Sequence, residues 1–366
     1  MITDGQDRKK LVNWAELAQT IKHWAIELGF QATGISATDL EEDEHHLLNW
    51  LDAGRHGEME YMRRHGVKRS RPAALLPGTV RVISVRMDYW PEPSLEPFAL
   101  LDDPSRGFVS RYALGRDYHK ILRRRLQRLA DRIAKQVGPF GYRAFVDSAP
   151  VLEKALARNA GLGWIGKHTN LLSRDAGSYF FLGELYTDLP LPVDEPLPSH
   201  CGQCDACIRA CPTDALVAPY ELDARRCVSY LTIEHHGPIP ELLRPLIGNR
   251  IYGCDDCQLV CPWNRFAAPT QEPDYTPRAP LDGLSLTDGL GWSREEFLRR
   301  TEGSAIRRIG HERWLRNVAV ALGNGASDVR TRAALRARLC HPSELVREHV
   351  VWALARLSQG AGITGF

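Results

Sequence analysis

The sequence lacks the features of a membrane or secreted protein. None of its apolar runs reaches the roughly 20 residues that a bilayer-spanning helix needs. The first seven residues are polar and contain no twin-arginine signal, apolar leader or lipidation site. We therefore expect a soluble, cytoplasmic protein, in a reducing compartment that suits unpaired thiols.

Lysine is absent from the last fifth of the chain. From Gly291 onward there are 13 arginines and seven acidic residues, although the whole 366-residue chain has a formal net charge of only +2. A basic terminal region beside a mildly acidic remainder predicts a polyanionic partner. The alternative, that these arginines only solvate helix faces and pair with glutamates, stays open.

Cysteine is scarce except in one window, where eight of the nine cysteines lie within 61 residues. The pattern is Cys-x2-Cys-x2-Cys-x3-Cys-Pro, then a single cysteine, then Cys-x2-Cys-x3-Cys-Pro. In two-cluster ferredoxins the fourth cysteine of each run ligates the other cluster. This rule predicts two 4Fe-4S clusters. The first set is Cys201, Cys204, Cys207 and Cys261, and the second set is Cys211, Cys227, Cys254 and Cys257.

Other uses of these cysteines fit less well. A zinc ribbon built on two Cys-x2-Cys pairs leaves four cysteines without a role. A disulfide framework does not suit a long chain without a secretory signal. Paired clusters predict the transfer of single electrons, but they do not identify what is reduced. Cys340 lies outside the window, and we expect it to be a buried packing residue.

Apolar periodicity divides the chain into three predicted domains. Strands that alternate with helices predict an α+β fold, with an α/β body over 1–190. A proline-rich linker leads into a ferredoxin-like domain over 191–275. Residues 276–366 read as an all-α, HEAT-like module, because similar apolar segments recur at an offset of 32 residues. A helical cap without repeat ancestry is the alternative.

Asp147 follows a predicted strand over 142–146 and precedes a helix that we expect Pro150 to open. In α/β folds, ligands bind at the carboxyl ends of strands. Burial beside Phe145 and Val146 would raise the pKa of this carboxyl and suit it to general acid catalysis. An aspartate before a helix is also a common N-cap, so both interpretations stay open.

Several segments resemble the epoxyqueuosine reductase family. They are Val-Asp-Ser-Ala-Pro at 146–150, Glu-Lys-Ala-Leu at 153–156, the glycine-rich 160–170, Arg-Tyr-Ala-Leu-Gly-Arg-Asp-Tyr-His at 111–119, and 249–258 around the second cysteine run. The uneven cysteine ladder, with Cys227 alone, also fits. The resemblance covers about residues 14–263, and the tail is similar to a HEAT-like extension found in some members.

The resemblance implies a reaction and a cofactor. Members reduce epoxyqueuosine to queuosine at the wobble position of tRNA anticodons, using Co(I) cobalamin that receives single electrons from the clusters. It implies a cobalamin held in the N-terminal body near the first cluster, and Asp147 matches the proton donor. Implied cobalamin contacts are Ser110, Tyr112, Asp147, Leu171, Leu182, Ser229 and Asp255. The chain has no Asp-x-His-x-x-Gly motif, so cobalt would have another lower ligand or none.

The resemblance also implies partners: an anticodon stem-loop and an electron donor that the sequence does not identify. We expect a monomer with no membrane contact. The basic tail and the arginine-rich 63–71 are the predicted tRNA-binding surfaces. Two alternatives remain. A corrinoid reductive dehalogenase would carry an export signal, and a non-catalytic ferredoxin-type electron carrier would leave the first 190 residues without a role.

Overall fold

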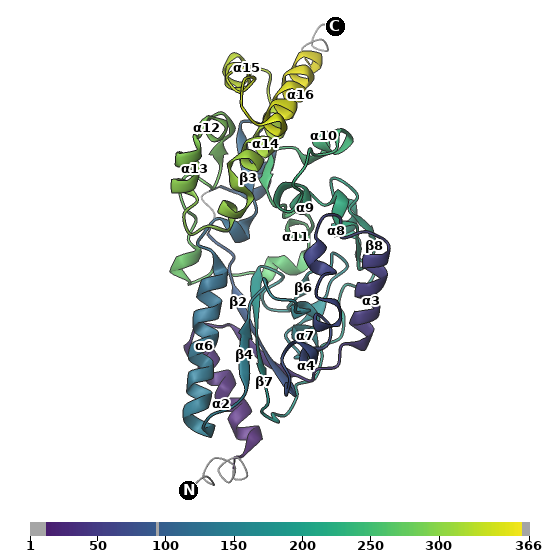
Figure 1. Cartoon of the computed structure of the whole chain (residues 1–366), viewed down its shortest axis with the longest axis vertical. Helices are drawn as coiled ribbons and strands as arrows, with labels where there is room; N and C mark the ends of the chain where they lie inside the picture. The colour runs from purple at the N-terminus through teal and green to yellow at the C-terminus, as the bar shows by residue number, and fades with distance from the viewer. Residues whose placement is uncertain (1–11, 93–94, 361–366) are drawn as a thin grey trace.

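The computed structural model describes residues 12–92 and 95–360. Its N-terminal body is built on a four-stranded sheet with the order β1-β2-β7-β4 (Figure 1). The strands are β1 (Ala32–Ser36), β2 (Arg81–Asp88), β4 (Tyr142–Phe145) and β7 (Phe180–Thr187). All three pairings are antiparallel. The α+β prediction is therefore confirmed, but describing the body as α/β is wrong, because that class is built on parallel strands.

Helices cover both faces of this sheet (Figure 1). α2 (Trp14–Glu27) and α6 (Tyr118–Val137) pack on one face, and the predicted apolar stripe of α6 is buried there. α7 (Glu153–Asn159) packs on the other face. Because consecutive strand residues point to opposite faces, Ile83 contacts the α2–α6 layer and Val82 contacts the α7 layer.

A second sheet joins the three predicted domains. Its order is β10-β3-β11, with β3 (Arg106–Val109) between β10 (Arg250–Tyr252) and β11 (Leu284–Ser285). β10 runs parallel to β3, and β11 runs antiparallel to it. Each strand comes from a different predicted domain, so the three segments are interlaced. The boundaries between the three domains stay predictions.

Within residues 12–92 and 95–360, none of the helices combines the length and the apolarity that a membrane span requires.

The remaining elements are short, and many of them form the cysteine-rich region. The elements are α3 (Glu41–Asp52), η1 (Glu60–Met62), η2 (Gly66–Lys68), α4 (Pro72–Leu75), α5 (Pro97–Asp102), η3 (Arg111–Ala113), β5 (Trp164–Ile165), β6 (Leu171–Leu172), α8 (Ala206–Arg209), β8 (Leu216–Ala218), β9 (Glu221–Leu222), η4 (Ala224–Arg226), α9 (Val228–Ile233), η5 (Glu241–Leu243), α10 (Arg244–Ile247), α11 (Asp256–Leu259), η6 (Pro262–Phe266) and η7 (Pro273–Tyr275).

The C-terminal module is helical, as predicted. After α12 (Leu286–Gly291), α13 (Arg294–Arg300) and η8 (Ala305–Ile309) come the buried α14 (Gly310–Gly323), the shorter α15 (Val329–Arg336) and α16 (Glu344–Gly360). The two apolar segments that align at 32 residues lie on α14 and α16, which pack together. A Cβ at Gly323 would lie 2.8 Å from the Ala353 Cα, so glycine permits this close approach. The HEAT-like ancestry of the module stays a prediction.

Cys340 is exposed in the turn after α15, so the expectation of a buried packing residue is wrong.

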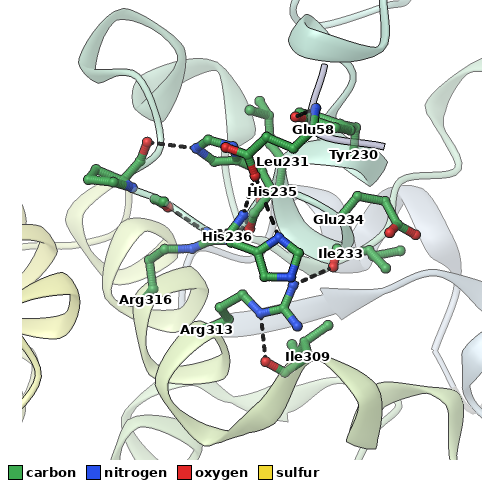
Figure 2. Close-up of polar contacts among 12 residues, drawn as sticks. Glu58, Tyr230, Leu231, Ile233, Glu234, His235, His236, Ile309, Arg313 and Arg316 are labelled. Atoms are coloured by element: carbon green, nitrogen blue, oxygen red, sulfur yellow. Dashed lines mark hydrogen bonds and ion pairs between the residues drawn. The ribbon is translucent and has the colours of Figure 1, made fainter. Parts of the chain in front are cut away.

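Much of the positive charge of the tail is used inside the molecule (Figure 2). The guanidinium of Arg316 is buried and donates to the backbone oxygens of Leu231, His235 and Gly237 at 2.6–2.8 Å. Arg313 donates to backbone oxygens of α9 and of η8. These arginines fasten α14 to the chain that follows α9, so the charge count overstates what the tail offers to a polyanion.

Candidate functional site

A cavity of about 410 Å³ lies between the N-terminal body and the cysteine-rich region. This volume is within the usual range of ligand pockets. Its lining brings together residues that are far apart in the sequence, including most of the predicted cofactor contacts. Those that line it are Ser110, Tyr112, Asp147, Leu171, Leu182 and Ser229.

Asp255 is not among the described residues that line this cavity, and its role as a cofactor contact stays a prediction. Its carboxylate is buried and accepts hydrogen bonds from the Ser110 hydroxyl at 2.5 Å and from the Arg111 backbone N–H at 2.8 Å. It therefore holds the loop after β3 in position, and that loop supplies Ser110 and Tyr112 to the cavity.

The fold brings each predicted set of four cysteines together. In the first set, burial and then the thiols of Cys261, Cys201 and Cys204 raise the pKa of Cys207 to about 11. In the second set, burial and the nearby thiol of Cys227 raise the pKa of Cys257, and Cys211 adds to this effect. These neighbours agree with the predicted exchange of Cys261 and Cys211 between the two runs, and the assignment of each cysteine to a cluster stays a prediction.

The two sets lie at different distances from the cavity. All four cysteines of the second set line it, and among the described lining residues there is none from the first set. The second set is thus the one adjacent to this cavity, whereas the expectation that a cofactor lies near the first cluster stays a prediction. In the first set Cys204 is exposed at the surface.

Asp147 is not a helix cap. It has a positive φ of 45° in the bend after β4, while α7 begins only at Glu153, with Leu152 as an N-cap that makes no side-chain hydrogen bond. The carboxylate of Asp147 instead faces the cavity and accepts a hydrogen bond from the Tyr118 hydroxyl. Its Oδ2 lies 3.3 Å from the Nε2 of His119. Both partners come from the first turn of α6.

These contacts reverse the predicted pKa shift of Asp147. Desolvation raises the pKa of the carboxyl, but the hydrogen bonds from His119 and Tyr118 outweigh it, so the pKa lies below its usual value. Desolvation also opposes the charged form of His119, yet its contacts with Asp117 and Asp147 raise its pKa to about 9. The Nδ1 of His119 lies 2.6 Å from Asp117 Oδ1. At neutral pH the proton that His119 and Asp147 could share is therefore on the imidazole of His119, which lies between the carboxylates of Asp117 and Asp147.

A second carboxyl, Glu153, lines the same cavity and was not identified from the sequence. Desolvation, and then the charge of Asp147, raise its pKa to about 7. Beneath it on β7, Glu184 is fully buried, and neither of its carboxyl oxygens has a partner among the described residues. Desolvation and the charge of Glu153 raise the pKa of Glu184 well above its usual value. Sequence spacing does not reveal such burial.

His168 gives the cavity an unsatisfied donor. Its Nδ1 accepts the backbone N–H of Asn170 at 3.1 Å, so the ring proton is on Nε2. Burial, and then the charge of Lys154, lower its pKa to about 4, which keeps the ring neutral. The Nε2 is buried without a partner in the described chain, although the residue lines the cavity. A buried donor of this kind is suited to a carbonyl or amide oxygen of a ligand.

Comparison with known proteins agrees with this geometry. The family model described as epoxyqueuosine reductase QueG, DUF1730, matches residues 69–148, and the 4Fe-4S double cluster binding domain matches residues 200–264. The epoxyqueuosine reductase of Pseudomonas aeruginosa is 64% identical over 343 residues, covering 93% of this chain and 95% of that protein. The epoxyqueuosine reductase of Escherichia coli is 59% identical over 343 residues, covering 93% and 89%.

Solved structures give the same result at lower identity. An epoxyqueuosine reductase crystallised with an epoxyqueuosine-modified tRNA-Tyr stem loop superposes with a TM-score of 0.87 at 29% identity, covering 95% of this chain and 92% of that one. The Bacillus subtilis epoxyqueuosine reductase superposes with a TM-score of 0.85 at 28% identity, covering 94% and 91%. In that structure a catalytic aspartate loop is swung out of the active site.

Proposed function

The chain belongs to the epoxyqueuosine reductase family, and we propose that it reduces epoxyqueuosine to queuosine in tRNA at the cavity that contains Asp147. One observation carries this proposal. The second set of cysteines and Asp147 line the same cavity, so an electron source and a proton site face one bound substrate. A ferredoxin-type carrier has no need for an acid that faces a cavity beside its clusters.

We propose that electrons pass from the first cluster to the second and then to the cavity. The exposed Cys204 supports the first cluster as the entry point, and the position of Cys227 and its partners in the cavity wall supports the second as the last station. Clusters transfer one electron at a time, whereas removal of an epoxide oxygen needs two. The site must therefore accumulate two electrons before the oxygen leaves.

The lining residues fit a corrinoid, which the resemblance to the family implies. The apolar wall of Leu171 and Leu182 suits a large ring, and the unsatisfied Nε2–H of His168 suits one of its amide carbonyl groups. Ser110, Tyr112 and Ser229 would complete the holding set. When bound, cobalamin would supply a reduced cobalt that opens the epoxide.

The residues of this chain would manage the protons. Conversion of an epoxide to an alkene and water consumes two electrons and two protons. We propose that Asp147 passes the first proton to the leaving oxygen. Because the pKa of Asp147 is lowered, the proton is stored on His119 and reaches the oxygen through the carboxylate. Glu153, whose pKa is about 7, is the second protonated group in the cavity and would supply the second proton.

Replacement of Asp147 tests this function. Asp147→Asn keeps the shape of the side chain but cannot carry the proton, so we expect a loss of turnover of about 10²- to 10⁴-fold. Absorbance of both clusters and binding of added cobalamin should be unchanged. Asp131→Asn, at an exposed position of α6, is the control and should retain full activity. An Asp147→Asn variant that reduces epoxyqueuosine at nearly the wild-type rate would overturn the assignment.

A further inference from the structure

A second cavity, of about 770 Å³, is lined mainly by cationic side chains. Five arginine and lysine side chains line it, against the two carboxylates of Asp117 and Glu302. The cations are Arg116, Lys120, Arg278, Arg307 and Arg308. Like charges at this density repel one another in the free protein, so the cavity is suited to a polyanion rather than to a neutral ligand.

The second cavity exists only in the folded chain. Arg116 and Lys120 flank the start of α6 in the N-terminal body, whereas Arg307 and Arg308 belong to η8 in the C-terminal module. Neither of these two groups is close to the other in the sequence. The cavity is therefore a junction between modules, and no local sequence pattern indicates it.

Three of these five cations already have partners, and two do not. Arg278 donates to the backbone oxygen of Glu302. Arg308 pairs with Glu234, and the Nε of Arg116 lies 3.3 Å from Asp274. Lys120 and Arg307 are exposed and have no hydrogen-bonded or ion-paired side-chain partner within the described residues. Their charges are therefore available to a ligand.

The second cavity adjoins the first through the His119–Asp147 contact. His119 lines the second cavity, and its Nε2 lies 3.3 Å from the Asp147 carboxylate, which lines the first. A nucleotide whose base occupies the first cavity would therefore have its sugar–phosphate backbone at the second. Enzymes that act on a base generally take it out of the stack, which leaves the backbone at the rim of the pocket.

We propose that the second cavity binds the phosphodiester groups that flank the epoxyqueuosine nucleotide, with Lys120 and Arg307 as the principal contacts. This inference rests on the proposed function, because it assumes that the nucleotide enters the first cavity. It narrows the predicted contact on the basic tail to Arg307, and adds Lys120 of the N-terminal body. Arg313 and Arg316 of the tail are committed to backbone oxygens, and within 63–71 Arg71 is paired with Glu44.

The test is the binding of a labelled anticodon stem-loop to the full-length protein at several salt concentrations. Each lost phosphate contact lowers the slope of log affinity against log salt by about 0.7–0.9. We expect the double variant Lys120→Ala/Arg307→Ala to lower the slope by about 1.4–1.8 and to weaken binding by about tenfold or more near 0.1 M salt. Far-UV circular dichroism and cluster absorbance should match the wild type.

A charge-matched control separates this site from the rest of the basic tail. Arg294→Ala/Arg336→Ala also removes two exposed arginines, from α13 and α15, and should leave both the slope and the affinity nearly unchanged. Equal losses in the two double variants, or no loss in Lys120→Ala/Arg307→Ala, would overturn the docking site while leaving the reductase function intact. A wild-type protein that fails to bind the stem-loop would overturn both.

Discussion

The two cavities differ in how they use charge. In the catalytic cavity, charged groups are few and coupled: the charge of Asp147 raises the pKa of Glu153, and Asp147 and His119 shift each other's pKa values. In the second cavity the charges are many and mostly exposed, and two of them are uncompensated. The difference separates proton and electron chemistry from recognition of the nucleic acid backbone. Changes at Lys120 and Arg307 should therefore leave the proton and electron chemistry largely intact.

Removal of the second cluster should have the largest effect. Cys227→Ala takes one ligand from the set beside the cavity, and we expect turnover to be abolished while stem-loop binding stays within about twofold of the wild type. Iron content and electron paramagnetic resonance should show one cluster in place of two. Cys340→Ala removes a cysteine that is exposed and outside both sets, so this control should change neither activity nor iron content.

Replacement of Glu153 should have an intermediate effect that depends on pH. Because its pKa is raised to about 7, the wild-type carboxyl is protonated below that pH and ionises above it. We expect kcat of the wild type to fall as the pH rises from 6 to 8, and Glu153→Gln to lose this limb with kcat about tenfold lower at pH 6. A Glu153→Gln profile that matches the wild type would exclude Glu153 as the second proton source.

The same substitution has a consequence for stability that a purely structural role would not produce. A carboxyl whose pKa is raised in the folded state makes the fold more stable at low pH than at high pH. This contribution is lost as the pH rises through about 7. The Glu153→Gln side chain does not titrate, so the variant does not lose this stability at high pH. We therefore expect the unfolding midpoint of the variant minus that of the wild type to be larger at pH 8 than at pH 5.

Salt should have the smallest effect on catalysis and should act through the second cavity. Raising salt from 0.05 to 0.2 M screens the phosphate contacts, so KM for the stem-loop should rise severalfold while kcat changes by less than about twofold. The coupled groups around Asp147 face the cavity at contact distance and are screened much less. A kcat that falls in parallel with affinity would contradict the separation of the two cavities.

The sequence was sufficient to predict the double-cluster domain, because the spacing within each cysteine run is local. The rule that exchanges the fourth cysteines anticipated the neighbours of Cys207 and Cys257, which the fold then supplies. The sequence also indicated Asp147, through the segment that resembles the family. The direction of the pKa shift could not be predicted, because Tyr118 and His119 reach Asp147 from another element only after folding.

Other expectations failed because they also depend on an arrangement that exists only after folding. Strand patterns do not state strand direction, so the antiparallel sheet was taken for an α/β body. A count of arginines does not distinguish Arg316, which is inside the molecule, from Arg307, which is outside. The hydrogen bond from Ser110 to Asp255 also joins residues 145 positions apart, which sequence spacing does not reveal.

The sheet formed by β10, β3 and β11 has a consequence for how the protein is made. β3 leaves the ribosome long before β10, and β11 leaves later still, yet Ser110 and Tyr112 directly follow β3 and line the catalytic cavity. The N-terminal body can therefore fold early with an incomplete cavity wall. A chain that is cut or stalled before residue 285 would carry all eight cluster cysteines but lack the last strand that fixes this wall. Assembly of the clusters can thus precede completion of the pocket.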